Sequence, residues 1–311
     1  MSVSRQQAAQ GQVLPALAPA ASQRRTNLLA VCATLFKVRI GVAIMLSALG
    51  GAVLAAEAWP APLDSLLLAL AVLIAASGAG AFNHYWDRDI DAVMGRTRQR
   101  PFVNGTLQAR PAWALLFLSM IAAGSLLAGF CFGFASGLLV AAGALTYALV
   151  YTIWLKRRSD WNIVIGGAAG SWAVLAGAAA FGDVGNPAVV LLAVVLFLWT
   201  PSHFWSLAIA IADDYARAGV PMLPVTRGVA TAVRWNLINT GALVVATLLL
   251  IACTGSPIVW LAGGGGALWL AWTTLAMARN TTRATTMAAF KASLIQLGLL
   301  LAGLFAMHAV P

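Results

Sequence analysis

The sequence predicts an all-α membrane protein with nine transmembrane helices, and three observations support this fold class. The 311-residue chain is 61% hydrophobic and only 9% charged, with a mean hydropathy of +0.87, whereas soluble domains carry roughly 25% charged residues. Nine apolar stretches are long enough to cross a bilayer. The basic residues gather at alternate ends of those stretches, as they do in multi-pass membrane proteins.

Short polar segments separate the predicted spans, and none is long enough to form a separate soluble domain. Gly133 and Gly137 predict a tight turn between the third and fourth spans, and residues 255–257 predict another between the seventh and eighth. The predicted spans are approximately Ile40–Ala56, Leu66–His84, Ala112–Cys131, Ala135–Trp154, Ile163–Phe181, Ala188–Ile211, Leu237–Cys253, Ile258–Ala276 and Ala292–Ala309.

The N-terminal segment, residues 1–27, is polar and contains no acidic residue. We expect a disordered cytoplasmic tail there; an organelle transit peptide is the alternative interpretation of the same composition. Residues 28–311 are expected to form one nine-helix domain.

The charge distribution predicts the orientation of the chain. All 19 Lys and Arg residues fall at one set of span ends, and the opposite ends carry only Glu57, Asp64 and Asp183. By the positive-inside rule, the N-terminus is cytoplasmic and, after nine spans, the C-terminus is outside. The net charge of +10 therefore reflects topology and anionic ligands in a lipid bilayer, and nucleic acid is not an expected partner.

The first acidic cluster follows the second span. If the helix continues past His84, then Asn83, Asp87 and Asp91 lie on one face, one turn apart each time. Two carboxylates and an amide stacked in this way suit Mg²⁺, which prefers hard oxygen ligands. The alternative interpretation is an ordinary solvated helix end. His84 points off this face and is expected at the membrane interface.

Basic residues follow the same cluster. Arg96 and Arg100 come next in the chain, while Lys156 and Arg157 end the fourth span. Carboxylates that hold Mg²⁺ beside cations that bind oxyanions predict a diphosphate site. Positive-inside anchoring is the alternative explanation for these residues.

A second acidic cluster ends the sixth span, at Asp213, Asp214 and Tyr215. Just upstream, Pro201 is expected to break or kink the helix beside His203. If both clusters face one cavity, Asp87, Asp91 and Asp214 would hold Mg²⁺ ions against one diphosphate.

These residues resemble a known family. The first cluster, with Arg96, Thr97, Arg100 and Pro101, is similar to the first aspartate motif of the UbiA-type intramembrane prenyltransferases. Three further stretches narrow the resemblance to the branch that farnesylates protohaem IX; they are Tyr151–Arg158, Trp161–Gly167 and Trp199–Val225.

The resemblance implies nine helices around a central cavity, with farnesyl diphosphate and haem B as substrates and Mg²⁺ as cofactor. It implies conversion of haem B to haem O for terminal oxidases, by Mg-assisted ionisation of the allylic diphosphate and water capture. The enzyme would be a multi-pass protein of the bacterial inner membrane with a cytoplasmic active site. A haem A synthase or a terminal oxidase is a candidate partner.

The resemblance also assigns residues. Asn83, Asp87, Asp91 and Asp214 are expected to be catalytic, and Ala218 stands where related enzymes usually carry a further acid. The stretch Gly170–Val174 lacks an expected proline. From the position of these residues rather than from the resemblance, the candidate haem and prenyl contacts are His203, Tyr151, Trp199, Trp205 and Tyr215. A hydrogen-bonded helix-end histidine is the alternative interpretation of His203.

Two other function classes stay open at this point. One is a prenyltransferase with a different acceptor, such as an aromatic quinone precursor or chlorophyllide; the segment around His203 favours haem. The other is a transporter or channel. Against a transporter, the charged clusters lie at one membrane face, with no charged path to the other.

Overall fold

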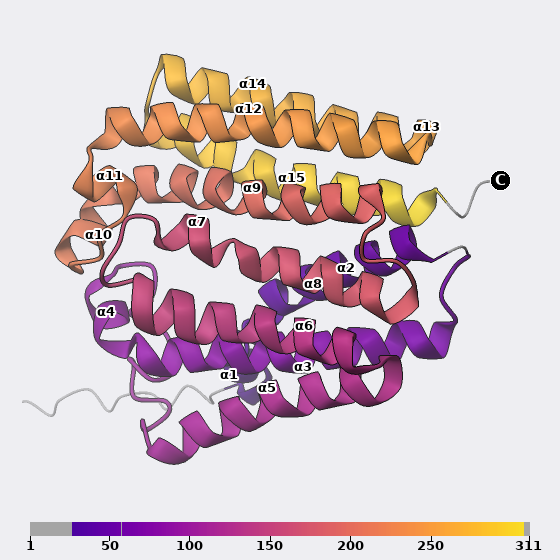
Figure 1. Ribbon diagram of the computed structural model, residues 1–311. Coiled ribbons are helices and arrows are strands. Elements are labelled where there is room, and N and C mark those ends of the chain that lie inside the picture. Colours follow the sequence, from indigo (N-terminus) through magenta and orange to yellow (C-terminus); the bar gives the residue numbers. More distant parts are fainter. Residues whose placement is uncertain (1–26, 57, 308–311) are drawn as a thin grey trace, which may run out of the picture.

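The computed structural model describes residues 27–56 and 58–307 (Figure 1). The predicted tail, residues 1–27, lies almost entirely outside the described residues. Within them the elements are α1 Leu28–Leu35, α2 Val38–Ala55, α3 Pro62–Trp86, α4 Arg88–Val93, α5 Pro111–Phe132, α6 Phe134–Leu145, the π-helix η1 Thr146–Leu155, α7 Asn162–Gly166, α8 Ala168–Phe181, α9 Pro187–Ala210, α10 Ala212–Arg217, α11 Leu223–Thr226, α12 Val229–Thr254, α13 Pro257–Val259, the π-helix η2 Trp260–Gly264, α14 Gly265–Arg279 and α15 Arg283–Ala306.

Among the described residues, nine helical stretches are long and apolar enough to cross a membrane, which confirms the predicted fold class. Most are single helices, but α6 continues into η1, α7 into α8, and α13 through η2 into α14. The seventh span begins at Val229 and the ninth at Arg283, eight or nine residues before the predicted starts. Each helix begins upstream of its apolar stretch, in a segment that contains a basic residue, Arg234 in α12 and Arg283 in α15, which hydropathy does not assign to the span.

Prolines and glycines set the ends of several spans. Proline stands in the first turn of α3, α5, α9 and α13, where its missing N–H costs no hydrogen bond. Gly133 and Gly255 adopt positive φ angles of 94° and 62° at the turns after α5 and α12, as predicted. Gly137 does not belong to the turn: it lies inside α6, and a Cβ there would be 2.7 Å from the carbonyl oxygen of Ser125.

Glycines also let the helices approach closely. A Cβ on Gly177 of α8 would overlap the carbonyl oxygen of Ala48 in α2, and a Cβ on Gly51 would overlap that of Val174. In lipid, close backbone approach of this kind drives helix association. In the fifth span, Gly167 approaches Phe197 of α9, with 3.1 Å between its virtual Cβ and the Phe197 carbonyl oxygen.

Helix α9 corrects one expectation. It runs unbroken from Pro187 to Ala210 through Pro201, so the proline does not end the helix. Asn239 of α12 supports this region, because its amide donates to the carbonyl of Leu198 at 2.6 Å and to the hydroxyl of Ser202 at 2.7 Å. Polar groups of a neighbouring helix commonly stabilise a proline-containing span in this way.

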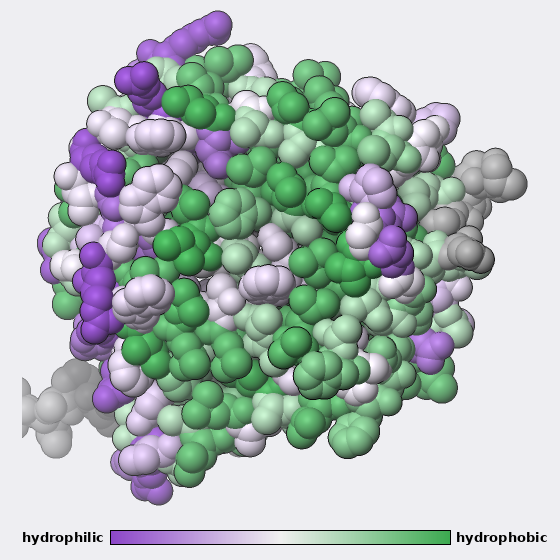
Figure 2. Space-filling model, viewed as in Figure 1, coloured by the Kyte–Doolittle hydropathy of each residue, from purple (hydrophilic) through white to green (hydrophobic). Residues whose placement is uncertain are grey.

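Basic side chains gather at one end of the bundle. The short helices α4, α10 and α11 lie together at the left in Figure 1, and Figure 2 shows hydrophilic side chains gathered at the same end, while the middle of this face is mostly apolar. We call this the basic end; Arg88, Arg100, Lys156, Arg217 and Arg227 lie in or beside these elements.

The close contact between α2 and α8 leads to a prediction about stability. Gly177→Ala should lower the melting temperature in detergent, because overpacking of this kind costs about 1–3 kcal/mol. Gly241→Ala is the matched control: Gly241 also lies inside a helix, and nothing lies within 4 Å of its virtual Cβ. Equal melting temperatures for the two variants would contradict the assigned contact.

Candidate active site

Asn83, Asp87 and Asp91 share one buried face at the basic end. Asp87 lies between α3 and α4, but the helical hydrogen bonds continue through it: its N–H donates to the carbonyl of Asn83 at 3.0 Å, and that of Asp91 to the carbonyl of Asp87 at 2.8 Å. The exposed fractions of Asn83, Asp87 and Asp91 are 3%, 0% and 1%. Two carboxylates are thus removed from water, which is costly without charged partners.

Each buried carboxylate has a cationic partner. Lys156 donates to Asp87 Oδ2, as does the amide of Asn83 at 2.6 Å. Arg100 donates to Asp91 Oδ2 at 2.6 Å. Within the described part of the chain, the other oxygen of Asp87, Oδ1, accepts no hydrogen bond; the Arg157 guanidinium lies 3.7 Å from it.

Arg157 is engaged mainly by Asp89. It makes two hydrogen bonds of 2.7 Å to the exposed Asp89 carboxylate, which hold the pKa of that carboxyl at about 2, below its usual value. The same bonds raise the pKa of Arg157. Both groups are therefore ionised at neutral pH, and the guanidinium sits at the edge of the buried cluster.

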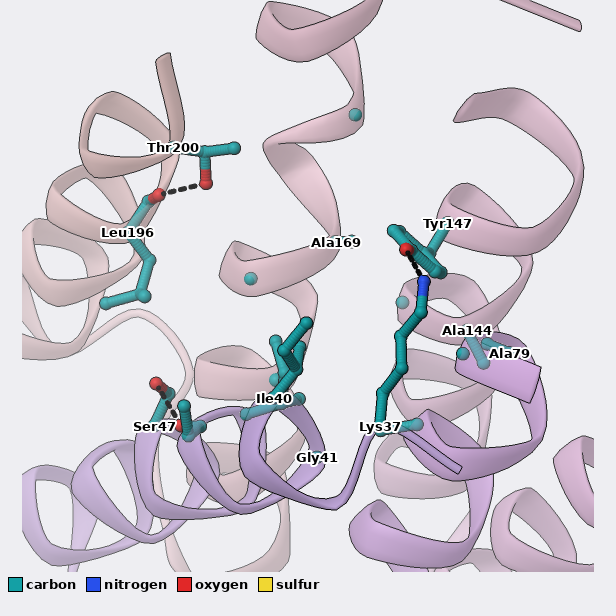
Figure 3. Close-up of a pocket in the computed structure, with 18 of the residues that line it drawn as sticks. Lys37, Ile40, Gly41, Ser47, Ala79, Ala144, Tyr147, Ala169, Leu196 and Thr200 are labelled. Atoms are coloured by element: carbon teal, nitrogen blue, oxygen red, sulfur yellow. Dashed lines mark hydrogen bonds between the residues drawn. The ribbon is translucent and has the colours of Figure 1, made fainter. Parts of the chain in front are cut away.

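Lys37 joins this cluster, although its sequence position suggested only a topology anchor. Its ammonium donates to Asn83 Oδ1 at 2.6 Å and to the Tyr147 hydroxyl at 2.9 Å. Figure 3 shows the side chain extending from the head of α2 to Tyr147 across the cavity. A continuous hydrogen-bonded chain thus runs from Tyr147 through Lys37 and Asn83 to Asp87.

The π-helix η1 forms the opposite wall of the cluster. Its wider turn is visible in the backbone hydrogen bond between residues five apart, from Lys156 N–H to the carbonyl of Tyr151. The Thr152 side-chain hydroxyl donates to the carbonyl of Tyr147 at 2.9 Å. The Thr152 hydroxyl also accepts a 3.0 Å bond from the Asn83 amide. Stretches of π-helix frequently occur at functional sites. This one carries Tyr147, Tyr151 and Thr152, and Lys156 follows it directly.

The second acidic cluster approaches the first across the basic end. Asp214 Oδ2 would lie 3.5 Å from a Cβ on Gly95, and its other oxygen pairs with Arg217. Tyr215 is buried beside Arg96, and burial raises the pKa of its phenol. In the described residues, no three His, Cys, Asp or Glu side chains are gathered closely enough to hold a metal ion by themselves.

An apolar cavity of about 320 Å³ opens below the cluster, between α2, α3, α6, η1, α7, α8, α9 and α15. Tyr151, Trp199 and His203 line it. Lys37 and Tyr147, which Figure 3 labels, line it as well. The size lies in the range typical of small-molecule sites. Such a cavity accepts a hydrophobic chain whose charged head remains at the basic end.

Three residues lie in surroundings that differ from those predicted: two are in the core and not at the cavity, and one is buried and not interfacial. Trp205 packs in the core with Leu223 and Met277 and is not among the residues that line the cavity. Tyr215 is likewise in a core cluster, below the loop that carries Arg96. His84 is 3% exposed, so it is buried and not interfacial, because α3 packs against its neighbours up to its last turn.

His203 is held firmly. Its Nδ1 lies 2.8 Å from the Ser293 hydroxyl, and its ring stacks between Trp199 and Phe290 with centroid separations of 4.4 Å on both sides. The imidazole therefore presents a fixed edge to the cavity.

The oxygen atoms available at this site suit a magnesium ion bound together with a diphosphate. Asp87 Oδ1 is a buried carboxylate oxygen without a hydrogen bond, and Mg²⁺ typically takes one or two protein carboxylates and completes its coordination with phosphate oxygens and water. Because the aspartates do not form a closed cage, an ion here would need oxygen ligands from a bound substrate.

Comparison with known proteins agrees with this geometry. Residues 44–295 match the UbiA prenyltransferase family. The chain is 49% identical over 273 residues to protoheme IX farnesyltransferase 2 of Paramagnetospirillum magneticum, covering 88% of this chain and 95% of that protein. It is 44% identical to protoheme IX farnesyltransferase 1 of the same organism, over 88% of this chain and 96% of the relative.

Solved structures share the fold at low identity. One, of a digeranylgeranylglyceryl phosphate synthase, aligns with a TM-score of 0.73 at 16% identity, over 90% of this chain and 98% of the other. A UbiA homologue from Archaeoglobus fulgidus, bound to DMAPP and Mg²⁺, aligns with a TM-score of 0.68 at 16% identity, over 90% and 99%. The chain belongs to the UbiA prenyltransferase family.

Proposed function

We propose that this enzyme transfers the farnesyl group of farnesyl diphosphate to a vinyl group of protohaem IX (haem B), giving haem O and diphosphate. The observation that carries the proposal is the buried cluster of Asp87, Lys156 and Asn83 at the end of an apolar cavity. The names of relatives at up to 49% identity support the choice of haem and farnesyl.

The diphosphate would bind at the basic end. Arg96, Arg100, Lys156 and Arg157 supply cations for its oxygens, and charged hydrogen bonds to such oxygens are among the strongest in proteins. Asp87, Asp91 and Asp214 would hold Mg²⁺ together with the diphosphate; the bound ion supplies charge stabilisation for the leaving group. The Archaeoglobus fulgidus homologue, bound to DMAPP and Mg²⁺, supports this arrangement.

The cavity would surround the reacting groups and stabilise the positive charge that forms. Cleavage of the allylic C–O bond sends the electron pair to the diphosphate and leaves a farnesyl cation among aromatic faces, including the stacked Tyr147 and Tyr151, which stabilise positive charge. The vinyl carbon attacks this cation, and water captures the new cation beside the porphyrin and releases a proton. The balance is haem B, farnesyl diphosphate and water to haem O, diphosphate and a proton.

The orientation follows from charge. The basic end would face the cytoplasm of a bacterial inner membrane, with the N-terminus inside and the C-terminus outside. Haem O would pass to a haem A synthase or a terminal oxidase.

The direct test is product analysis. Purified protein incubated with haem B, farnesyl diphosphate and Mg²⁺ should yield haem O, identified by mass spectrometry. Asp87→Asn removes the buried negative charge with little change in shape, and turnover should fall about 100-fold or more, since such electrostatic groups contribute at this level. Haem O formation by Asp87→Asn at the wild-type rate would remove Asp87 from the mechanism.

Donor binding is tested at Lys156. Lys156→Met should raise KM for farnesyl diphosphate by about tenfold or more, because one charged hydrogen bond contributes about 1.5–3 kcal/mol. Lys291→Met is the control, since Lys291 is an exposed lysine on α15. Stability is measured in parallel, because Asp87 loses its partner. An unchanged KM in a folded Lys156→Met protein would mean that Lys156 only balances the charge of Asp87 and does not bind the donor.

A further inference from the structure

The head of α2 carries two cations that the diphosphate site does not use. We propose that Lys37 and Arg39 bind the carboxylate groups of the prenyl acceptor, at a subsite separate from that of the diphosphate. The inference rests on the proposed function, under which those carboxylates are the haem propionates.

The charge of the cavity wall is the first observation. Among the described residues that line the cavity, the acidic side chains are absent and the two Lys and Arg residues are Lys37 and Arg39. The rest of the wall is largely aliphatic and aromatic. A carboxylate is expensive to bring into such surroundings without a cation, so a wall of this composition favours a flat apolar ligand with anionic groups at one edge.

The second observation is the availability of these cations. Arg100, Lys156 and Arg157 are each paired with an aspartate. Arg39 is exposed and makes neither a hydrogen bond nor an ion pair with another described residue. Lys37 donates to Asn83 and Tyr147, which leaves one of its three N–H groups for a ligand.

The backbone places both side chains at the cavity. Lys37 has φ 47° and ψ 43°, and it is the one non-glycine residue with positive φ among those described. This left-handed residue separates α1 from α2 and costs free energy for a side chain with a Cβ. In Figure 3, Lys37 reaches toward Tyr147 while Ile40 and Gly41 continue the wall along α2.

Position also separates this subsite from the diphosphate site. The residues assigned to the diphosphate lie after α3 and at the end of η1, whereas Lys37 and Arg39 begin α2. Lys37 contacts the first group through Asn83, and Arg39 does not. Arg39 is therefore the residue whose removal should affect the acceptor alone.

The test compares haem B with its dimethyl ester, in which both carboxylates are masked. Each porphyrin is titrated into purified full-length protein in detergent, without farnesyl diphosphate, and binding is followed by the Soret band. Wild type should bind haem B about tenfold or more tightly than the ester, in line with one or more charged hydrogen bonds. In Arg39→Gln this preference should fall to about threefold or less.

The control is Arg279→Gln, which removes an exposed arginine at the end of α14 outside the cavity and should keep the full preference. All variants are measured in the same detergent, so partition of the ester into micelles changes the preference of each protein by the same factor and cancels when the variants are compared. KM for farnesyl diphosphate should be unchanged in Arg39→Gln.

Three results would overturn the inference. Equal affinity of wild type for both porphyrins would do so while leaving farnesyl transfer to haem intact. An increase in KM for farnesyl diphosphate in Arg39→Gln, with the porphyrin preference retained, would show that Arg39 binds the diphosphate and not the carboxylates of the acceptor. Absence of saturable binding of either porphyrin would overturn the proposed acceptor as well.

Discussion

The ion pair between Asp87 and Lys156 is the interaction on which the basic end of the molecule depends. The carboxylate is completely buried, and a buried charge without its partner costs several kcal/mol. Lys156 directly follows η1, while Asn83 links the same carboxylate to Thr152 and, through Lys37, to the head of α2. Three spans are therefore fixed to one another by residues of the candidate active site.

Most of the fold can be predicted from the sequence. Hydropathy and the one-sided placement of Lys and Arg predict nine spans, because burial in lipid imposes a strong and local pattern on composition. The spacing of Asn83, Asp87 and Asp91 is equally local: four-residue steps place side chains on one helix face. The glycine turns at Gly133 and Gly255 follow for the same reason.

The remaining features depend on contacts between distant segments. Lys37 becomes part of the cluster through Asn83, 46 residues away, and no pattern around Lys37 indicates that. The π-helical turn of η1 arises in an apolar stretch that reads as an ordinary span. Pro201 was expected to break or kink α9, but the helix continues through it, supported by Asn239 of α12. Trp205 turns into the core although it stands two residues from His203. Side-chain direction in a fully apolar helix is set by its neighbours, which hydropathy does not specify.

The charge asymmetry of the cavity has a consequence for how the substrates and the product move within the membrane. Its charged lining residues are at the head of α2, beside the aspartate cluster, and the deeper wall is apolar. A ligand held by its anionic head at that end keeps its tail within the adjoining leaflet of the bilayer. Donor, acceptor and product are amphiphiles of the same polarity, so none of them has to cross the bilayer midplane with its charge. The reaction then needs only two-dimensional diffusion within a single leaflet, and the product remains there.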